Sequence, residues 1–274
     1  MKQNIARALS LSLVLLSLLG VGGLFADENT VNLESVVIQN FDDSAKEPWF
    51  LIASKFATAG FPKLNYVKSW PQALYGSNVD NKDLRVLGVA MLFDRKEYNW
   101  VDLVPGTKTG EGADAQYAPT ELPLPGRVKM LDMWVWSGNY DYYMEAFVRD
   151  YKGIVHIIPL GDLAFVGWKN IRINIPENIP QSKKYLPKRE GLSFVKLRIW
   201  TRPTENVAIM IKGNDPDPKD PDYQTKIDAR NLDKSVKFYF DNIKVLTDTF
   251  ETLYDGDSLT RPDILKDAWG EGKK

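Results

Sequence analysis

The sequence contains no cysteine and only one histidine among its 274 residues. Disulfides, thiolate metal sites and cysteine-linked lipids are therefore excluded, and so are zinc sites built from several His or Cys ligands. The single histidine, His156, lies in the apolar stretch VHIIPL, which favours a structural histidine on a strand. A Ser-His-Asp triad would need this residue together with partners in suitable places.

An excess of charge of either sign is also missing. The chain has 35 Lys and Arg residues and 36 Asp and Glu residues, which gives a formal net charge of −1. Nucleic-acid binding needs a basic footprint, so this balance argues against a nucleic-acid partner.

Long apolar runs are confined to the N-terminus. Leu9 to Leu19 is apolar and follows the basic residues Lys2 and Arg7, and glycines at positions 20, 22 and 23 end the run before Ala26. This pattern predicts a signal peptide over residues 1–26, because the run is short for a membrane span of about 20 residues. An uncleaved anchor is the alternative. We expect residues 27–250 to form a single domain and residues 251–274 to form a C-terminal tail.

Helical periodicity is scarce, and short apolar or alternating stretches dominate the rest of the chain. Ile171, Ile173 and Ile175 alternate with polar residues, and Val195, Leu197 and Ile199 alternate with Lys196, Arg198 and Trp200. This period of two is typical of strands with one wet and one dry face. The pattern predicts an all-β fold, a β-sandwich of jelly-roll type with long loops and little helix.

Some local assignments are less direct. The stretch 48–59 is compatible with either a helix or a strand, and 84–93 reads as a strand buried on both faces. Residues 137–139, Ser-Gly-Asn, predict a hairpin or short loop between two strands. The loop 213–222 is acidic and rich in proline, which is typical of a solvated connection.

The stretch from Gly60 to Gly76, GFPKLNYVKSWPQALYG, is aromatic and contains two prolines, but it has no histidine, cysteine or carboxylate. It therefore offers no general base or metal ligand, whereas its prolines indicate ordered turns. Either its aromatic side chains brace a loop against the fold, or they contact a partner. These side chains are Phe61, Tyr66, Trp70 and Tyr75.

Acidic residues offer two candidate sites. Glu145 and Asp132 lie on neighbouring predicted strands and could form a cross-strand pair for glycoside hydrolysis, although a solvated sheet face is the commoner arrangement. Asp42, Asp43 and Asp241 could hold a structural Ca²⁺ ion through oxygen ligands. Asp241 interrupts the apolar run FYFDNIKVL, where a carboxylate is costly unless it is paired or hydrogen-bonded. Hydrogen bonds to loop amides, or plain exposure, are the alternatives.

Tryptophan and basic residues supply the main signal for an interaction surface. Trp200 shares a predicted strand face with Lys196 and Arg198, with Arg202 just beyond, and such a face can stack on sugar rings or anchor a protein interface. Trp134 and Trp136 are two residues apart and share a face. We expect these two to be core residues and Trp200 to be at the surface.

Several segments in order resemble the spirochaete periplasmic flagellar filament outer-layer (sheath) protein family. The resemblance covers most of the chain from about Val36 to Leu246. The segments are SKF at 54–56, GFPKLNYVKSWPQALYG at 60–76, LGVAMLFDRKEYNWVDLVP at 87–105, LDMWVWSGNYDYYMEAFVRDYKG at 131–153, GWKNIRINIP at 167–176 and FYFDNIKVL at 238–246.

The resemblance implies a structural, non-enzymatic protein that coats the core flagellin filament in the periplasm and contacts other sheath subunits. It also implies a sandwich similar to carbohydrate-binding modules, and hence contact with glycans on flagellin. The residues that we expect to bind a partner are Trp200, Arg198, Arg202, Lys196, Tyr66 and Trp70. Two other interpretations stay open, a free periplasmic carbohydrate-binding module and, less favoured, a glycoside hydrolase. The first predicts binding to soluble glycans, and the second predicts turnover that depends on Glu145.

Overall fold

A computed structural model of the chain describes residues 31–43, 48–77, 79, 83–181, 191–203 and 219–249, with 259, 264, 266, 269 and 270. The chain divides into two units, Met1–Val31 and Asn32–Lys274, and all the named helices and strands belong to the second. The predicted signal peptide and most of the acidic loop 213–222 lie outside the described residues. No helix in the described part is long and apolar enough to cross a membrane.

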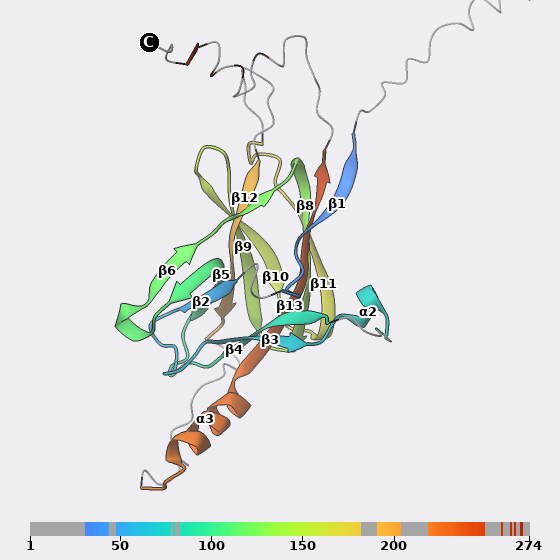
Figure 1. Cartoon of the computed structure of the whole chain (residues 1–274). Helices are drawn as coiled ribbons and strands as arrows, with labels where there is room; N and C mark the ends of the chain where they lie inside the picture. The colour runs from blue at the N-terminus through green and yellow to red at the C-terminus, as the bar shows by residue number, and fades with distance from the viewer. Residues whose placement is uncertain are drawn as a thin grey trace, which may run out of the picture. The chain divides into compact units, whose positions relative to one another are not determined.

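Two antiparallel sheets make up the fold, which confirms the predicted all-β sandwich (Figure 1). One sheet has the strand order β11 (Val166–Asn174), β8 (Arg127–Gly138), β13 (Val236–Asp248), β4 (Arg85–Met91) and β3 (Lys63–Lys68), with β1 (Leu33–Gln39) also paired to β13. The other has the order β10 (Val155–Asp162), β9 (Tyr142–Arg149), β12 (Leu192–Thr201), β5 (Trp100–Thr109) and β2 (Trp49–Ala53), with β6 (Gln116–Pro119) on β5 and β7 (Leu122–Leu124) on β12. We call these the six-stranded and the seven-stranded sheet.

The core lies between the inner faces of the two sheets. Alternation places Met133 and Val135 of β8 on the inner side of one sheet and Met144 and Ala146 of β9 on the inner side of the other, all fully buried. Aromatic rings fill the space between them. Burial of one such ring stabilises the fold by roughly 1.5–3 kcal/mol. The largest buried rings include Phe41, Tyr142, Phe194, Phe238 and Phe240.

The connection at residues 137–139 is not a hairpin. β8 belongs to the six-stranded sheet and β9 to the seven-stranded sheet, so the turn after Gly138 carries the chain across the sandwich. Asn139 takes a left-handed conformation there, with φ of 65°. The turn residues were recognised correctly, but Ser-Gly-Asn does not distinguish a hairpin from a crossing between sheets.

Helices are few among the described residues: α2 (Gln72–Tyr75), the 3₁₀ turn η1 (Gly112–Asp114) and α3 (Tyr223–Lys234). The sequence did not indicate α3, which leads directly into β13. Within α3 only Asn231 is buried, so the helix has no apolar stripe to reveal its period. The ambiguous stretch 48–59 contains the strand β2.

Trp134 and Trp136 are not core residues, contrary to expectation. Both are half-buried on the outer face of the six-stranded sheet, because the inner face of β8 is occupied by Met133 and Val135. Trp136 lies directly opposite Trp168 of β11 and Tyr239 of β13. Its ring meets that of Tyr239 edge-on at 5.3 Å.

Gly88 of β4 continues this cross-strand line on the far side of Tyr239. A Cβ atom at Gly88 would lie 3.0 Å from the Tyr239 ring, so glycine gives that ring room to approach the strand closely.

The segment Gly60–Gly76 forms β3 and α2 and is held against the sandwich at several points. Tyr66 packs on the core from β3, and the indole N–H of Trp70 donates to the carbonyl of Gly76 at 3.0 Å. The Tyr75 hydroxyl accepts from Asn242 Nδ2 of β13 at 3.0 Å. Tyr66 and Tyr75 therefore brace the segment.

Candidate interaction surface

A row of three aromatic side chains crosses the outer face of the seven-stranded sheet. Strand register places Tyr143 of β9 opposite Trp200 of β12, and Trp200 opposite Trp100 of β5. The rings of Tyr143 and Trp200 stack with an interplanar angle of 11° and a centroid distance of 6.1 Å. All three side chains are half-buried, so one side of the row remains open to solvent. We call Tyr143, Trp200 and Trp100 the aromatic row.

Beside the aromatic row, two residues along each strand on the same face, a second register line carries charge. Arg198 of β12 lies between Glu145 of β9 and Asp102 of β5. Its guanidinium donates to both carboxylate oxygens of Asp102, from Nε at 2.5 Å and Nη2 at 2.8 Å, and Lys196 Nζ lies 2.7 Å from the same carboxylate. Asp102 is only 3% exposed. We call Arg198, Lys196 and Asp102 the ionic cluster.

The ionic cluster helps to orient the aromatic row. The guanidinium carbon of Arg198 lies 4.3 Å from the Trp100 ring centre and 5.2 Å from that of Trp200, distances that favour cation–π attraction. The hydrogen bonds to Asp102 raise the pKa of Arg198 above its ordinary value, despite the opposing effect of burial. Trp200 is further oriented by its indole N–H, which donates to Glu145 Oε2 at 2.8 Å.

Arg202 lies at one end of this surface. It pairs with Asp141 before β9 and with Asp162 at the end of β10, and its guanidinium lies 5.2 Å from the Tyr143 ring centre. The hydrogen bond to Asp162 is the main reason that the pKa of Arg202 is raised, and burial opposes it. The residue ties two strand ends together beside the aromatic row.

The structure thus assembles Lys196, Arg198, Trp200 and Arg202, four of the predicted partner-binding residues, on one surface. Tyr66 and Trp70 lie elsewhere, on and just after β3 of the other sheet. The structure also changes what the basic residues do. Arg198 and Lys196 have side chains 18% and 21% exposed and share the single carboxylate of Asp102, so they support the rings more than they offer free charge.

Trp100, Tyr143 and Asp102 also belong to the surface, although they were not among the residues predicted to bind a partner. A usable signal was present, because Trp100 and Asp102 in NWVDLV alternate with the core residues Val101 and Leu103. The sequence alone does not show which strands are neighbours in the sheet, so these residues could not be assigned to the same surface as Trp200.

Glu145 and Asp132 do not form a pair. They lie on different sheets and on opposite outer faces, because β8 and β9 are joined by a crossing and not by a hairpin. Asp132 is held by Arg172 Nε at 3.0 Å and Asn170 Nδ2 at 2.6 Å, whereas Glu145 accepts from Trp200. The proposed two-carboxylate arrangement for glycoside hydrolysis is therefore not assembled by these residues.

His156 lies on β10 beside the β9–β10 turn, and its Nε2 atom is 2.9 Å from Asp150 Oδ2. Asp150 also accepts from the backbone N–H groups of Lys152 and Ile154, so its carboxylate organises the turn. Burial alone would raise the pKa of Asp150, but these hydrogen bonds hold it below its ordinary value. The arrangement is that of a turn held by hydrogen bonds.

The predicted calcium residues are brought together only in part. No three His, Cys, Asp or Glu side chains among the described residues converge on a space suited to a metal ion. Asp42, Asp43 and Asp241 therefore do not form a three-carboxylate site there. Burial is the main reason that the pKa of Asp241 is raised to about 8, a hydrogen bond from the backbone of Asn242 opposes this shift, and the charge of Asp42 adds to it.

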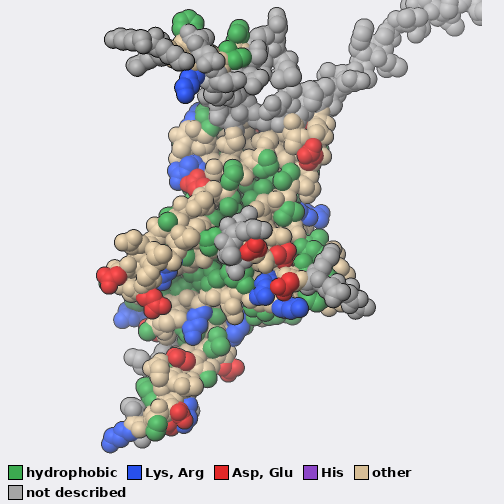
Figure 2. Space-filling view, viewed as in Figure 1, with side chains coloured by type: hydrophobic (Ala, Val, Ile, Leu, Met, Phe, Trp, Pro, Cys, Tyr) green, Lys and Arg blue, Asp and Glu red, His purple; other side chains and the backbone are tan. Residues whose placement is uncertain are grey.

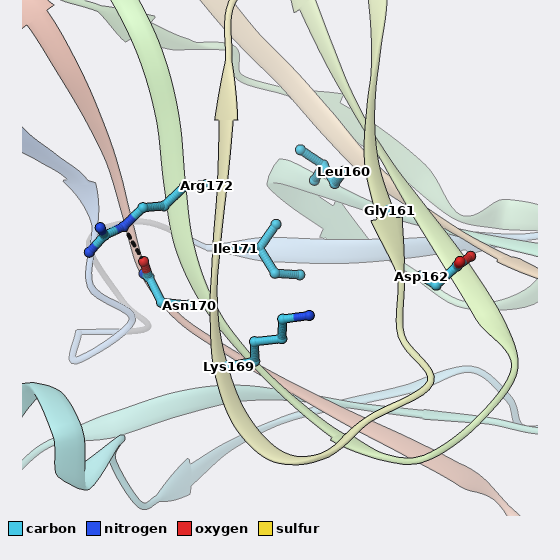
Figure 3. A pocket seen from close by; sticks show the side chains of 7 residues that line it. All are labelled: Leu160, Gly161, Asp162, Lys169, Asn170, Ile171 and Arg172. Carbon is cyan, nitrogen blue, oxygen red and sulfur yellow. Dashed lines mark hydrogen bonds between the residues drawn. The ribbon is translucent and has the colours of Figure 1, made fainter.

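A pocket of about 550 Å³ lies at the seam between β10 and β11, the edge strands of the two sheets. Figure 3 shows Lys169 and Ile171 of β11 directed toward Leu160 of β10, whereas Arg172 lies on the other side of β11 and Asp162 points away. Because its polar groups do not converge, this pocket is a weaker candidate site than the aromatic row.

Charges on the visible face of the molecule are mixed. Figure 2 shows basic and acidic side chains interspersed over the described residues in view. This distribution agrees with the balanced composition of the chain.

Solved structures with a similar arrangement of strands include two carbohydrate-binding modules. One is a family 61 module in complex with β-1,4-galactotriose (TM-score 0.37, 13% identity, 78% of this chain and 99% of the module covered). The other is the family 11 module of Clostridium thermocellum in complex with a mixed-linked tetrasaccharide (TM-score 0.38, 11% identity, 79% and 98% covered). At these scores the sugar ligands are not transferred to this chain.

A curated relative is a flagellar filament outer layer-like protein of Brachyspira hyodysenteriae (strain ATCC 49526 / WA1). It is 25% identical over 169 residues, which cover 62% of this chain and 60% of the relative. The family model described as flagellar filament outer layer protein FlaA matches residues 45–211, more than half of the chain. The chain therefore belongs to the FlaA family of flagellar filament outer layer proteins.

Proposed function

We propose that this chain is a structural subunit of the outer layer of a periplasmic flagellar filament. It coats the flagellin core and tunes the shape and stiffness of the filament for motility. The family match over residues 45–211 is the observation that carries this proposal. The apolar N-terminal run after Lys2 and Arg7 supports export to the periplasm by a signal peptide.

The aromatic row is our candidate for the contact with flagellin or with a neighbouring outer-layer subunit. Tyr and Trp are enriched at the centres of protein interfaces, where rings that are already ordered lose little conformational entropy on binding. The ionic cluster and Glu145 supply that order here. In a coat, each subunit repeats the same contact, so modest energy per copy suffices for stable assembly.

The test is co-sedimentation with purified core filaments. Trp200→Ala removes the central ring of the row, and we expect it to weaken sedimentation at least tenfold, since interface tryptophans commonly contribute more than about 2 kcal/mol. Trp136→Ala is the matched control, because Trp136 is equally half-buried but lies on the other sheet. Equal binding by wild type and Trp200→Ala would remove the aromatic row from the interface.

A second candidate uses the same row to bind glycans on flagellin. The nearly parallel rings of Tyr143 and Trp200 form a platform of the kind on which a sugar ring can stack. Titration of the protein with glycans released from flagellin separates the two candidates. Saturable binding that Trp200→Ala abolishes supports the glycan contact, whereas normal filament binding without glycan binding supports the protein contact.

A further inference from the structure

A groove lies on the outer face of the six-stranded sheet, where β3, β4 and the start of β13 run side by side. Its volume is about 350 Å³, and Leu232 of α3 forms part of its wall. Most of the remaining wall is apolar and comes from Val67 of β3, Ala90 of β4 and Tyr239 of β13. A groove of this size accommodates one large side chain of a partner.

Gly88 deepens the floor of this groove. On the side away from Tyr239 it lies opposite Asn65 of β3, and a Cβ atom there would lie 3.3 Å from the carbonyl oxygen of Asn65 as well as against the Tyr239 ring. The missing side chain therefore leaves a depression between neighbouring strands.

Two lysines border the groove, and neither is paired with a carboxylate among the described residues. Lys63 of β3 is exposed, whereas Lys237 of β13 donates from Nζ to the carbonyl oxygens of Leu232 at 2.7 Å and Ser235 at 3.1 Å. On the other sheet, by contrast, Arg198 is held by a carboxylate. An occupant that complements this groove combines an apolar side chain with acidic neighbours.

The C-terminal tail of the chain has this chemistry. Trp269 is 84% exposed, more than any other large apolar side chain among the described residues. Residues 264, 266 and 269 are helical, and helical spacing puts Leu265 on the same side as Trp269. Acidic residues recur beside them at every fourth position, namely Asp263, Asp267 and Glu271. We call residues 263–271 the tail segment.

The groove and the start of the tail lie at opposite ends of β13. Lys237 and Tyr239 of the groove stand near the beginning of the strand, whereas the tail follows its last residue, Asp248. Nine residue steps separate Tyr239 from Asp248, which corresponds to about 30 Å along an extended strand. Each copy can therefore offer a groove at one end and a tail at the other.

We infer that the tail segment docks into the groove of a second copy of this chain. Trp269 is the apolar anchor, and the acidic residues face Lys63 and Lys237, as in the recognition of amphipathic helices by apolar grooves. Because the donating and accepting surfaces differ, the contact is heterologous and links copies head to tail. It adds a contact between neighbouring subunits to the proposed coat. Free subunits should make it too, so its test needs no filament and is separate from the test of the coat.

Sedimentation velocity of the purified protein tests this inference. Concentrations extend to about 1 mM, the order of effective concentration between tethered modules. The wild type should form an open series of oligomers that grows with concentration. Trp269→Ala in the tail and Leu232→Asp in the groove should each weaken self-association at least about tenfold, because one removes the anchor and the other repels the acidic segment. The controls Leu259→Ala and Val166→Asp change other exposed apolar side chains and should associate as the wild type does.

A mixture of the two variants shows whether the contact joins different copies. Trp269→Ala keeps an intact groove and Leu232→Asp keeps an intact tail, so the equimolar mixture should form a dimer and no larger species. The inference is overturned if the wild type stays monomeric over the whole range, as it would if each tail occupied the groove of its own chain. It is also overturned if Trp269→Ala associates as well as the wild type, or if the mixture behaves as either variant does alone.

Discussion

Asp102 shows how a single buried charge can shape a surface although its own carboxylate is almost fully covered. Its carboxylate is buried beside the aromatic row and receives three hydrogen bonds from Arg198 and Lys196. Arg198 in turn lies against the rings of Trp100 and Trp200. The charge therefore acts through the geometry of the rings, and variants of Arg198 report on folding as well as on binding.

Arg198→Ala should lower the free energy of unfolding by about 3 kcal/mol, because it leaves Asp102 buried with Lys196 as its only cation. Urea denaturation measures this change. Arg85→Ala is the control: it breaks an exposed pair with Asp83 at 3.5 Å and should cost less than about 1 kcal/mol. A loss for Arg198→Ala as small as that of the control would show that Asp102 does not depend on Arg198.

At the scale of elements, the β9–β10 turn depends on Asp150. The side chain is fully buried and accepts from two backbone N–H groups while it contacts His156. Because these hydrogen bonds lower the pKa of Asp150 below 3.8, the ionised carboxylate stabilises the fold above that pH. This stabilisation is lost as the pH falls through the lower pKa of the folded protein.

Asp150→Asn should therefore be less stable than the wild type at neutral pH, and its stability should fall less steeply as the pH drops below 3.8. Denaturant melts over a range of acidic pH values measure both effects. Asp83→Asn, an exposed carboxylate, should follow the wild-type curve. Parallel curves for Asp150→Asn and the wild type would contradict the role of Asp150 in the turn.

Strands were predictable from the sequence where one face is buried and the other is exposed to solvent. Ile171 and Ile173 in β11, and Leu197 and Ile199 in β12, alternate with polar residues as the wet and dry faces require. In β12 a bulge between Phe194 and Lys196 interrupts the alternation, and a pattern of period two does not reveal where a strand gains a residue.

Other features depended on long-range pairing. Trp136 was expected in the core because it is large and apolar. On β8, however, Met133 and Val135 point to the inner face, so Trp136 lies on the outer face. The part of the candidate surface that lies on a single strand was predictable, because alternation along β12 indicates Lys196, Arg198 and Trp200. Asp102 and Tyr143 lie on neighbouring strands, more than 50 residues away in the chain, and only the pairing of β5 and β9 with β12 places them on this surface.

At the scale of the whole molecule, the described domain offers aromatic rows on both outer faces. The row of Tyr143, Trp200 and Trp100 covers one sheet, and Trp168, Trp136 and Tyr239 line up across the other. The first row is the candidate contact with the filament, and the second row, on the other sheet, supplies Trp136 as the matched control.

The most direct test of the coat proposal is to follow this chain in isolated periplasmic flagella. Filaments are purified from cells with and without the core flagellin, and the chain is quantified in the filament and soluble fractions. We predict that it co-purifies with filaments, decorates their surface in immunogold images, and moves to the soluble fraction when the core is absent. Recovery in the soluble fraction of both strains, with bare filaments in the images, would contradict its role as an outer-layer subunit.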